Sequence, residues 1–256
     1  MQGKTLFVSG GTRGIGKAIV YAFAQKGVNV AFTYASSADT ANEIIADIED
    51  KYGVKCRAYK LDILEPNTYK DVYKLFDEDF DRLDFFISNA IISGRAVVGG
   101  FGPFMRLKPR GLNNIYTATV DAFVVGAQEA TKRIEKHGEG GSIISMSSTG
   151  NLVYTPNYAG HGTNKAAVEA MVRYAAAELG EKNIRVNAVS GGPIDTDALK
   201  AFPNYEEVKA EVVRRSPLSR MGDVTDLTGA CLFLCSKDSS WLTGQTIVVD
   251  GGTTFQ

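Results

Sequence analysis

The chain has 256 residues, of which 44% are hydrophobic and 22% charged, a composition typical of globular proteins and unlike that of disordered or fibrous chains. Its 28 basic and 29 acidic residues leave a formal net charge of −1, so bulk charge favours neither nucleic acid nor a membrane surface as a partner. Cys56, Cys231 and Cys235 fit neither a disulfide framework nor a structural zinc site, and we expect no metal. The N-terminal segment lacks a signal-peptide pattern, which predicts a soluble cytoplasmic protein.

Short apolar runs alternate with longer amphipathic runs along the chain. Strands are expected at 4–10, 28–34, 55–62, 83–90, 141–148, 184–190 and 244–250. Helices are expected at 17–26, 38–52, after Pro66, and at 117–136, 158–181 and 224–234.

This alternation predicts an α/β protein with a single Rossmann-type, doubly wound parallel sheet of about seven strands and helices on both faces. Residues 1–256 are expected to form one dinucleotide-binding catalytic domain. Two segments break the alternation. The stretch 91–111 contains five glycines and the stretch 195–217 is polar with two prolines, so both are candidate substrate loops.

The segment "SGGTRGIGKA", residues 9–18, follows the first predicted strand and opens the first helix. Gly10, Gly14 and Gly16 permit a tight turn and let the backbone approach a pyrophosphate at the positive end of the helix. An ordinary strand-to-helix turn is the alternative. The G-x-x-x-G-x-G spacing resembles that of the short-chain dehydrogenase/reductase family.

The end of the second predicted strand bears on the choice of cofactor. A carboxylate there would bind the ribose 2′-hydroxyl of NAD and repel the 2′-phosphate of NADP. "AFTYASSADT" offers none until Asp39, whereas Arg13, Lys17, Ser36 and Ser37 can supply positive charge and hydroxyl donors. These residues favour NADPH (NADP⁺) over NADH. Alternatively, Arg13 is a solvated loop cation and the serines cap the next helix.

The family resemblance implies further cofactor contacts. Asp62 in "KLDI" matches an adenine-contacting aspartate, and Ile194 and Thr196 match positions that bond the nicotinamide carboxamide. In "SNA", Asn89 and Ala90 match the family pattern, whereas Ser88 and Ile91 depart from it. The predicted cofactor-binding set is Gly10, Thr12, Arg13, Gly14, Ile15, Gly16, Ser36, Asp62, Ile63, Asn89, Ala90, Lys165, Ile194 and Thr196.

The catalytic residues of the family are a serine, a tyrosine and a lysine. Ser148, seventeen residues before Lys165, matches the serine, and Lys165 matches the lysine that bonds the nicotinamide ribose. In most dehydrogenases of the family the tyrosine precedes the lysine by four residues, a position that His161 occupies here. Tyr158 precedes Lys165 by seven residues. Seven residues at about 100° each return to within about 20° on a helix, so both positions are expected to face the cleft.

The displaced tyrosine suits a particular reaction. Ketone reduction places hydride on the carbonyl carbon, whereas reduction of a 2-enoyl thioester places it on the β-carbon, two bonds farther from the oxygen that becomes the enolate. The stabilising hydroxyl should then shift by about 2.5 Å or more. A tyrosine nearer the start of the helix shifts in the required sense.

The Tyr-x₆-Lys spacing in "NYAGHGTNKA" and the stretch "VNAVSGGPIDTDALKAFPN", residues 186–204, resemble enoyl-acyl-carrier-protein reductases, especially the branch called enoyl-ACP reductase III. The resemblance implies an NADPH-dependent homotetramer that reduces the 2,3 double bond of a trans-2-enoyl thioester of acyl-carrier protein or CoA in fatty-acid elongation. Tyr158, Lys165 and Ser148 would be catalytic. Thr119 stands where many family members have a proton-relay asparagine.

We expect four residues to bind substrate: Tyr154, His161, Leu199 and Phe202. His161 could instead act as general acid, since an imidazole titrates near pH 6.5. A carbonyl or alcohol oxidoreductase, such as a 3-oxoacyl-ACP reductase or hydroxysteroid dehydrogenase, is the alternative function. A catalytically idle nucleotide sensor is a third. Candidates for a basic rim that docks the acidic carrier protein are Arg106, Lys108, Arg110, Arg214, Arg215 and Arg220.

Overall fold

The computed structural model describes residues 1–92, 97–200 and 205–254, apart from the side chains of residues 197 and 198. Its strands form one parallel seven-stranded sheet in the order β3-β2-β1-β4-β5-β6-β7, which confirms the predicted fold class. The strands are β1 Thr5–Val8, β2 Asn29–Tyr34, β3 Cys56–Lys60, β4 Phe85–Ser88, β5 Gly141–Ser148, β6 Ile184–Gly191 and β7 Thr246–Val249.

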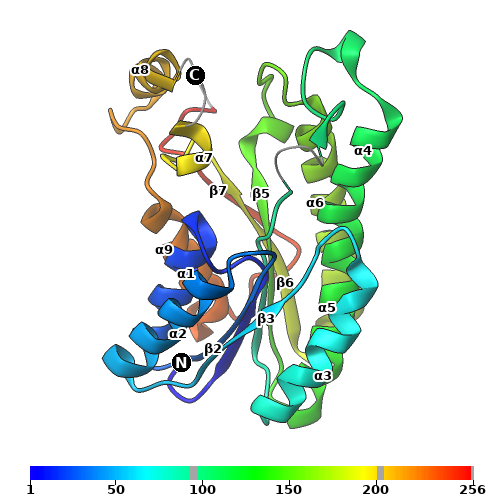
Figure 1. Ribbon diagram of the computed structural model, residues 1–256, viewed down its shortest axis with the longest axis vertical. Coiled ribbons are helices and arrows are strands. Elements are labelled where there is room, and N and C mark those ends of the chain that lie inside the picture. The colour runs from blue at the N-terminus through cyan, green and yellow to red at the C-terminus, as the bar shows by residue number, and fades with distance from the viewer. Residues whose placement is uncertain (93–96, 201–204, 255–256) are drawn as a thin grey trace.

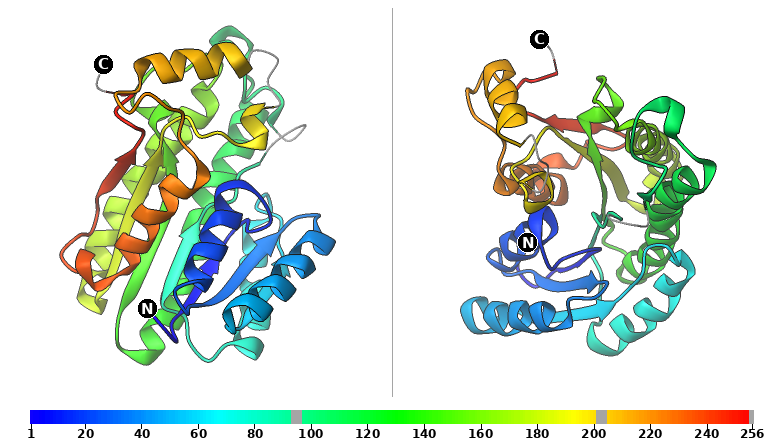
Figure 2. Two further views of the ribbon diagram at one scale, coloured as in Figure 1. Left: turned by 90° about the vertical axis from the view of Figure 1, so that its left-hand side faces the viewer. Right: turned by 45° about the horizontal axis from the view of Figure 1, so that its top comes forward.

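Helices cover both faces of the sheet (Figure 1). Helices α1, α2 and α9 lie on one face and α3, α4, α5 and α6 on the other, while α7 and α8 lie beyond the carboxyl edge (Figure 1, Figure 2). Their bounds are α1 Gly14–Ala24, α2 Ala38–Tyr52, α3 Tyr69–Asp79, α4 Pro109–Tyr116, α5 Ala122–Ile134, α6 Ala159–Leu179, α7 Asp197–Lys200, α8 Tyr205–Arg215 and α9 Val224–Cys235.

The core consists of two apolar layers separated by the sheet. Successive side chains on a strand point to opposite faces. Accordingly, Phe7 and Phe86 pack under α3, α5 and α6, whereas Leu6, Val8 and Ile87 pack under α1 and α9. The three cysteines are free and buried, as predicted. Burial on both faces explains why the strands read as continuous apolar runs.

Several predicted boundaries differ from the structure, including those of α1, α4 and the 195–217 loop. Helix α1 begins at Gly14 rather than at residue 17, because glycine carries no apolar periodicity by which to recognise a helical turn. Helix α4 begins at Pro109, inside the predicted 91–111 loop, since proline is favoured in a first helical turn. The predicted 195–217 loop contains α7 and α8.

Strands β1 and β4 are neighbours in the sheet although β2 and β3 lie between them in sequence. The strand order therefore reverses between β1 and β4, and ligands of doubly wound folds bind outside the carboxyl ends of the strands at such a point. The glycine-rich segment follows β1 and Asn89 follows β4, so both lie at this point. No helix in the described part of the chain is long and apolar enough to cross a membrane.

Candidate active site

The turn between β1 and α1 requires glycine at specific positions. Gly10 and Gly14 adopt φ angles of 74° and 53°, which side-chain-bearing residues rarely adopt. A Cβ atom on Gly16 would lie 1.8 Å from the carbonyl oxygen of Gly10. The turn is therefore compact because of these glycines.

Hydrogen bonds fix this turn to the neighbouring strands. The Gly10 amide donates to Thr33 Oγ1 at 3.0 Å. Asn89 Nδ2 donates to the carbonyl oxygens of Ser9 and Gly10 at 3.0 and 2.9 Å. Ser9 Oγ accepts bonds from the amides of Asn89 and Ala90. Asn89 and Ala90 thus lie beside the glycine turn and help to shape it, and Thr33 and Ser9 are supports that sequence reasoning missed.

The turn fits a dinucleotide pyrophosphate. A Cβ on Gly14 would project into open space, so the first turn of α1 is accessible. The first turn holds no acidic residue, and Arg13, at the N-cap, is exposed and caps no backbone amide with its side chain. The amides of this turn and the positive end of α1 therefore suit an anion.

The remaining predicted cofactor residues differ in their accessibility. Ser36, after β2, and Asp62, after β3, are exposed, and Asp62 Oδ1 accepts a bond from the Leu64 amide. Ile63 and Ile194 are buried, so their backbones are more accessible to a ligand than their side chains. Thr196 is half-buried and its Oγ1 accepts a bond from the Leu199 amide at 3.3 Å.

Ser148 and Tyr158 meet at the carboxyl end of β5. Ser148 is the last residue of β5, and its Oγ accepts a bond from the Gly150 amide at 3.2 Å. Tyr158 is the N-cap of α6 with φ −102° and ψ 2°, so it lies just outside the helix that was predicted to include it. Burial raises the pKa of the Tyr158 hydroxyl, and a hydrogen bond with the Ser148 side chain partly opposes this shift. At neutral pH the hydroxyl is protonated and can donate.

Lys165 lies two turns further along α6 and is only 7% exposed. Its Nζ donates to the carbonyl oxygen of Met146 on β5 at 2.6 Å. Burial lowers the pKa of Lys165 to about 8, and the charge of Glu169 opposes part of this shift. Glu169 is itself buried and accepts a 2.5 Å bond from Ser147 Oγ.

Sequence reasoning missed Glu169 and Ser147. The available signal was spacing, because Glu169 follows Lys165 by four residues and therefore lies on the same helical face. A carboxylate on the helical face that was expected to line the cleft indicates a charge partner for the lysine.

His161 packs between two aromatic rings. It is 4% exposed, and its ring centroid lies 5.4 Å from that of Tyr158 and 4.4 Å from that of Phe101. Burial, followed by the charge of Lys165, lowers the pKa of His161 to about 4. The imidazole is therefore neutral at neutral pH and a poor general acid, which argues against the acid role left open by the sequence.

Residues 99–102, which belong to the predicted 91–111 loop, pack against the beginning of α6. A Cβ on Gly160 would lie 2.1 Å from the Gly100 carbonyl oxygen, and the Gly102 amide donates to the Asn157 carbonyl at 3.1 Å. Phe101 contacts the rings of both Tyr158 and His161. The glycines thus permit the backbone approach that brings Phe101 to Tyr158, a role that sequence did not predict.

The other predicted substrate residues are less well defined. Tyr154 is 89% exposed and Leu199 is half-buried, while Phe202 lies outside the described residues. Thr119 lies in a π-helical segment, Thr117–Asp121, between α4 and α5. Such segments are frequent at functional sites, but within the described part of the chain no hydrogen bond ties Thr119 to Ser148, Tyr158 or Lys165.

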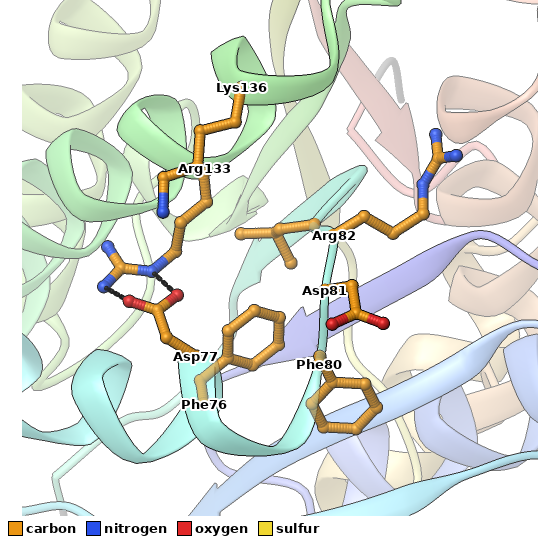
Figure 3. A pocket seen from close by; sticks show the side chains of 8 residues that line it. Phe76, Asp77, Phe80, Asp81, Arg82, Arg133 and Lys136 are labelled. Atoms are coloured by element: carbon orange, nitrogen blue, oxygen red, sulfur yellow. Dashed lines mark hydrogen bonds and ion pairs between the residues drawn. The ribbon is translucent and has the colours of Figure 1, made fainter.

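A pocket at the opposite, amino edge of the sheet is structural in character. Figure 3 shows Arg133 facing Asp77, with two hydrogen bonds of 2.7 and 2.6 Å between them. The pocket lies between the end of α3 and β4, and its lining comprises Phe76, Asp77, Phe80, Asp81, Arg82, Leu83, Arg133 and Lys136. Of its charged groups, Arg133 on α5 and Asp77 on α3 form an ion pair that joins the two helices.

The same edge holds Asp84, His137 and Glu139, whose side chains are close enough to share a metal ion. Arg82 and Lys4 already pair with both carboxylates at 2.6 to 3.0 Å. The negative charges of the two carboxylates are therefore balanced by Lys4 and Arg82 of the protein itself.

Comparison with known proteins identifies the family. A family model described as enoyl-(acyl carrier protein) reductase matches residues 10–254. A 1-cyclohexenylcarbonyl-CoA reductase of Streptomyces collinus is 37% identical over 96% of this chain and 85% of that protein. A 3-oxoacyl-[acyl-carrier-protein] reductase of Staphylococcus aureus is 32% identical over 97% of both chains.

Solved structures agree with this assignment. A 7α-hydroxysteroid dehydrogenase in complex with NADH and 7-oxo glycochenodeoxycholic acid matches with a TM-score of 0.89 and 32% identity, covering 98% of this chain and 94% of that one. A blue fluorescent protein from a metagenomic library, in complex with NADPH, matches with a TM-score of 0.87 and 30% identity over 98% of both chains. The chain belongs to the short-chain dehydrogenase/reductase family and is an oxidoreductase of that family.

Proposed function

We propose that the protein reduces the 2,3 double bond of a trans-2-enoyl thioester with NADPH. The observation that carries the proposal is the pairing at the start of α6. Tyr158 is placed beside Ser148, while the usual tyrosine position holds His161, buried and neutral at neutral pH. The group that can donate to a developing oxyanion is thus the displaced phenol.

Each residue has a distinct role in the proposed reaction. Bound NADPH would supply a hydride for the β-carbon of the substrate. The Tyr158 hydroxyl would donate a hydrogen bond to the thioester carbonyl oxygen, where negative charge develops, and Ser148 would orient that hydroxyl. The resulting enolate would then take a proton from solvent at its α-carbon, which completes the reduction. Lys165 holds the nicotinamide ribose and supplies positive charge near the phenol.

The choice of NADPH rests on the residues after β1 and β2. Arg13 and Ser36 are both exposed, and none of the residues of β2 is acidic. A 2′-phosphate therefore meets no carboxylate on this strand and finds a cation on the glycine turn. Binding titrations with NADPH and NADH, with Arg13→Ala as the variant, test this assignment.

The choice of a thioester draws support from a relative. The name of the Streptomyces collinus protein denotes reduction of a cyclohexenylcarbonyl-CoA, in which the double bond is conjugated to the thioester carbonyl. The enoyl-(acyl carrier protein) reductase description of the family model points in the same direction. Acyl-carrier protein and CoA are both candidate carriers, and fatty-acid elongation is the proposed context.

Carbonyl reduction is the second candidate, because relatives at 32% identity are a 3-oxoacyl-[acyl-carrier-protein] reductase and a 7α-hydroxysteroid dehydrogenase. In that reaction Tyr158 would have to donate a proton to the oxygen of the same carbonyl group whose carbon receives the hydride. The position of His161 disfavours this reaction, since a phenol nearer Lys165 is absent.

A parallel assay separates the candidates. Oxidation of NADPH is followed with a 2-enoyl thioester, the 3-oxoacyl thioester of equal chain length on the same carrier, and a keto-steroid. Turnover confined to the enoyl substrate supports the proposal. Turnover confined to the ketones refutes it and makes the second candidate the working function.

We also propose a homotetramer. Large apolar side chains are exposed on α6 and on or near β7, and include Met171, Tyr174, Trp241 and Val248. Such surface is typical of protein–protein contacts. Light scattering on the purified protein measures the assembly mass, and a monomeric mass would refute this proposal.

A further inference from the structure

Tyr158 occupies a position with little intrinsic rigidity. It precedes the first residue of α6, so only its carbonyl, which accepts a bond from the Gly162 amide at 2.8 Å, belongs to the helical hydrogen-bond pattern. Its amide bonds to Thr155 within a turn at 3.2 Å. A side chain at a helix N-cap needs contacts from elsewhere to hold one rotamer.

Three neighbours supply these contacts. A Cβ on Gly150 would lie 2.6 Å from the Tyr158 ring, so the phenol lies directly on that backbone. The His161 ring stacks beside the phenol with an interplanar angle of 25°, and the Phe101 ring meets it edge-on at 5.9 Å. Phe101 and His161 also contact each other, so the three rings form a closed cluster around the phenol.

The imidazole contributes a ring rather than a hydrogen bond to this cluster. His161 Nε2 is buried and has no hydrogen-bond partner among the described residues. The low pKa of His161, about 4, keeps the ring uncharged over the neutral range. A neutral imidazole at this place packs much as a phenyl ring would.

We propose that His161 is a positioning residue that fixes the Tyr158 phenol, through ring stacking, in the rotamer in which its hydroxyl meets Ser148 and the substrate carbonyl. The inference rests on the proposed role of Tyr158 as the group that stabilises the enolate. It extends that role by assigning a function to the side chain at the position where the family resemblance places a tyrosine.

Two matched variants test the proposal. His161→Phe keeps a planar ring and removes both nitrogens, whereas His161→Leu keeps an apolar side chain and removes the ring. Leucine also fills much of the space, so the variant is expected to fold, and thermal unfolding of both proteins checks this. We measure kcat, KM for the enoyl thioester and the NADPH dissociation constant for each.

The ring-stacking role predicts a particular pattern. His161→Phe should retain kcat within about threefold, and His161→Leu should lose about tenfold in kcat, the rate equivalent of one aromatic pair. NADPH affinity should stay within about twofold in both, because neither nitrogen nor ring is assigned to the cofactor. A higher kcat in His161→Phe than in His161→Leu would show that the ring of residue 161 positions Tyr158 and that no hydrogen bond from the imidazole is needed.

Several outcomes would overturn the inference. Equal losses in both variants would mean that an imidazole nitrogen contacts the substrate. Full kcat in His161→Leu would mean that ring stacking does not hold the Tyr158 rotamer. If a variant lost NADPH affinity and thermal stability together with kcat, His161 would only support the fold and would not position Tyr158. The wild-type enzyme is assayed first with enoyl and 3-oxoacyl thioesters, so a failure of the proposed function is seen independently of the variants.

Discussion

Tyr158 is the residue at which chemistry and cofactor binding should separate. We predict that Tyr158→Phe lowers kcat for the enoyl thioester by about 10²- to 10³-fold, the usual cost of losing one oxyanion donor, and leaves the NADPH dissociation constant within about twofold. Steady-state kinetics and fluorescence titration measure the two effects. Tyr154→Phe is the control, because Tyr154 is 89% exposed. A loss of NADPH affinity that matches the loss of rate would contradict the assignment.

Lys165 should make cofactor binding depend on pH. Burial lowers its pKa from 10.5 to about 8, so the folded protein loses this positive charge as pH rises through 8. NADPH affinity should therefore weaken across that range, measured by titration at successive pH values. The effect on the free energy of unfolding has the opposite sign. Between about pH 8 and pH 10.4 the lysine is protonated in the unfolded chain and neutral in the folded protein, so the folded state gains stability as pH rises through this range.

Lys165→Met provides the control for this titration. It should bind NADPH more weakly at neutral pH and show little change in affinity near pH 8. An unchanged pH dependence in the variant would assign the titration to another group.

His161 should make the protein sensitive to acid. Its pKa falls from 6.5 to about 4 in the folded protein, so unfolded chains bind the proton first and stability is lost as pH falls through this window. His161→Phe removes that proton and also an unpartnered buried nitrogen, whose burial costs about 1–3 kcal/mol. We predict that the variant is more stable than wild type at pH 7 and that the difference grows towards pH 4, measured by thermal unfolding. A difference that is constant with pH would contradict the assigned titration.

At the scale of elements, the turn between β1 and α1 is expected to bind the pyrophosphate through its backbone. Gly14 has φ 53° and a Cβ there would enter open space. We predict that Gly14→Ala weakens NADPH binding by about tenfold or more, because the methyl group occupies the place of the phosphate and a positive φ is costly for alanine. Titration with NADPH and thermal unfolding measure affinity and strain separately.

Gly53→Ala is a matched control for that substitution. Gly53 ends α2 with φ 63° and also has open space around it, but it lies at the amino edge of the sheet. Both variants should lose similar stability, about 1 kcal/mol, and only Gly14→Ala should lose NADPH affinity. If Gly14→Ala and Gly53→Ala lost NADPH affinity equally, backbone strain would be the cause, and not a methyl group in the place of the pyrophosphate.

At the scale of the whole molecule, the structure divides the predicted basic rim into two groups. Arg214 pairs with Glu211, Arg220 pairs with Asp226, and Arg215 donates to the Thr253 carbonyl. Arg106, Lys108 and Arg110 are exposed on the segment that packs against α6, and no ion pair engages them within the described ranges. The second group is therefore the better candidate to meet an acidic carrier protein.

We predict that Arg106→Gln combined with Lys108→Gln raises KM for an enoyl-acyl-carrier-protein by about three- to tenfold at low salt, because rim charges steer association. KM for a small enoyl thioester without a carrier should not change. Arg214→Gln, on α8, is the control. Equal changes with both substrates would place these cations at the acyl group rather than at the carrier.

Much of the molecule could be predicted from sequence because the signals are local. Strand runs such as that of β1, which reads TLFV, are mostly apolar since both sheet faces are covered, and the glycines of residues 10–16 stand directly between a strand and a helix. Boundaries failed where glycine or proline begins a helix, as at Gly14 and Pro109, because neither contributes an apolar period.

The succession of strands and helices along the chain, the glycine turn after β1, and the spacing of Ser148, Tyr158 and Lys165 could be predicted from the sequence, since these features depend on residues that are near one another along the chain. The surroundings of these residues could not be predicted, because they depend on how distant segments pack. The ring of Phe101 against Tyr158, the burial of His161 and the pairing of Glu169 with Ser147 join segments separated by 20 to about 60 residues. Burial sets the pKa values of His161 and Lys165, and burial is a property of the folded chain.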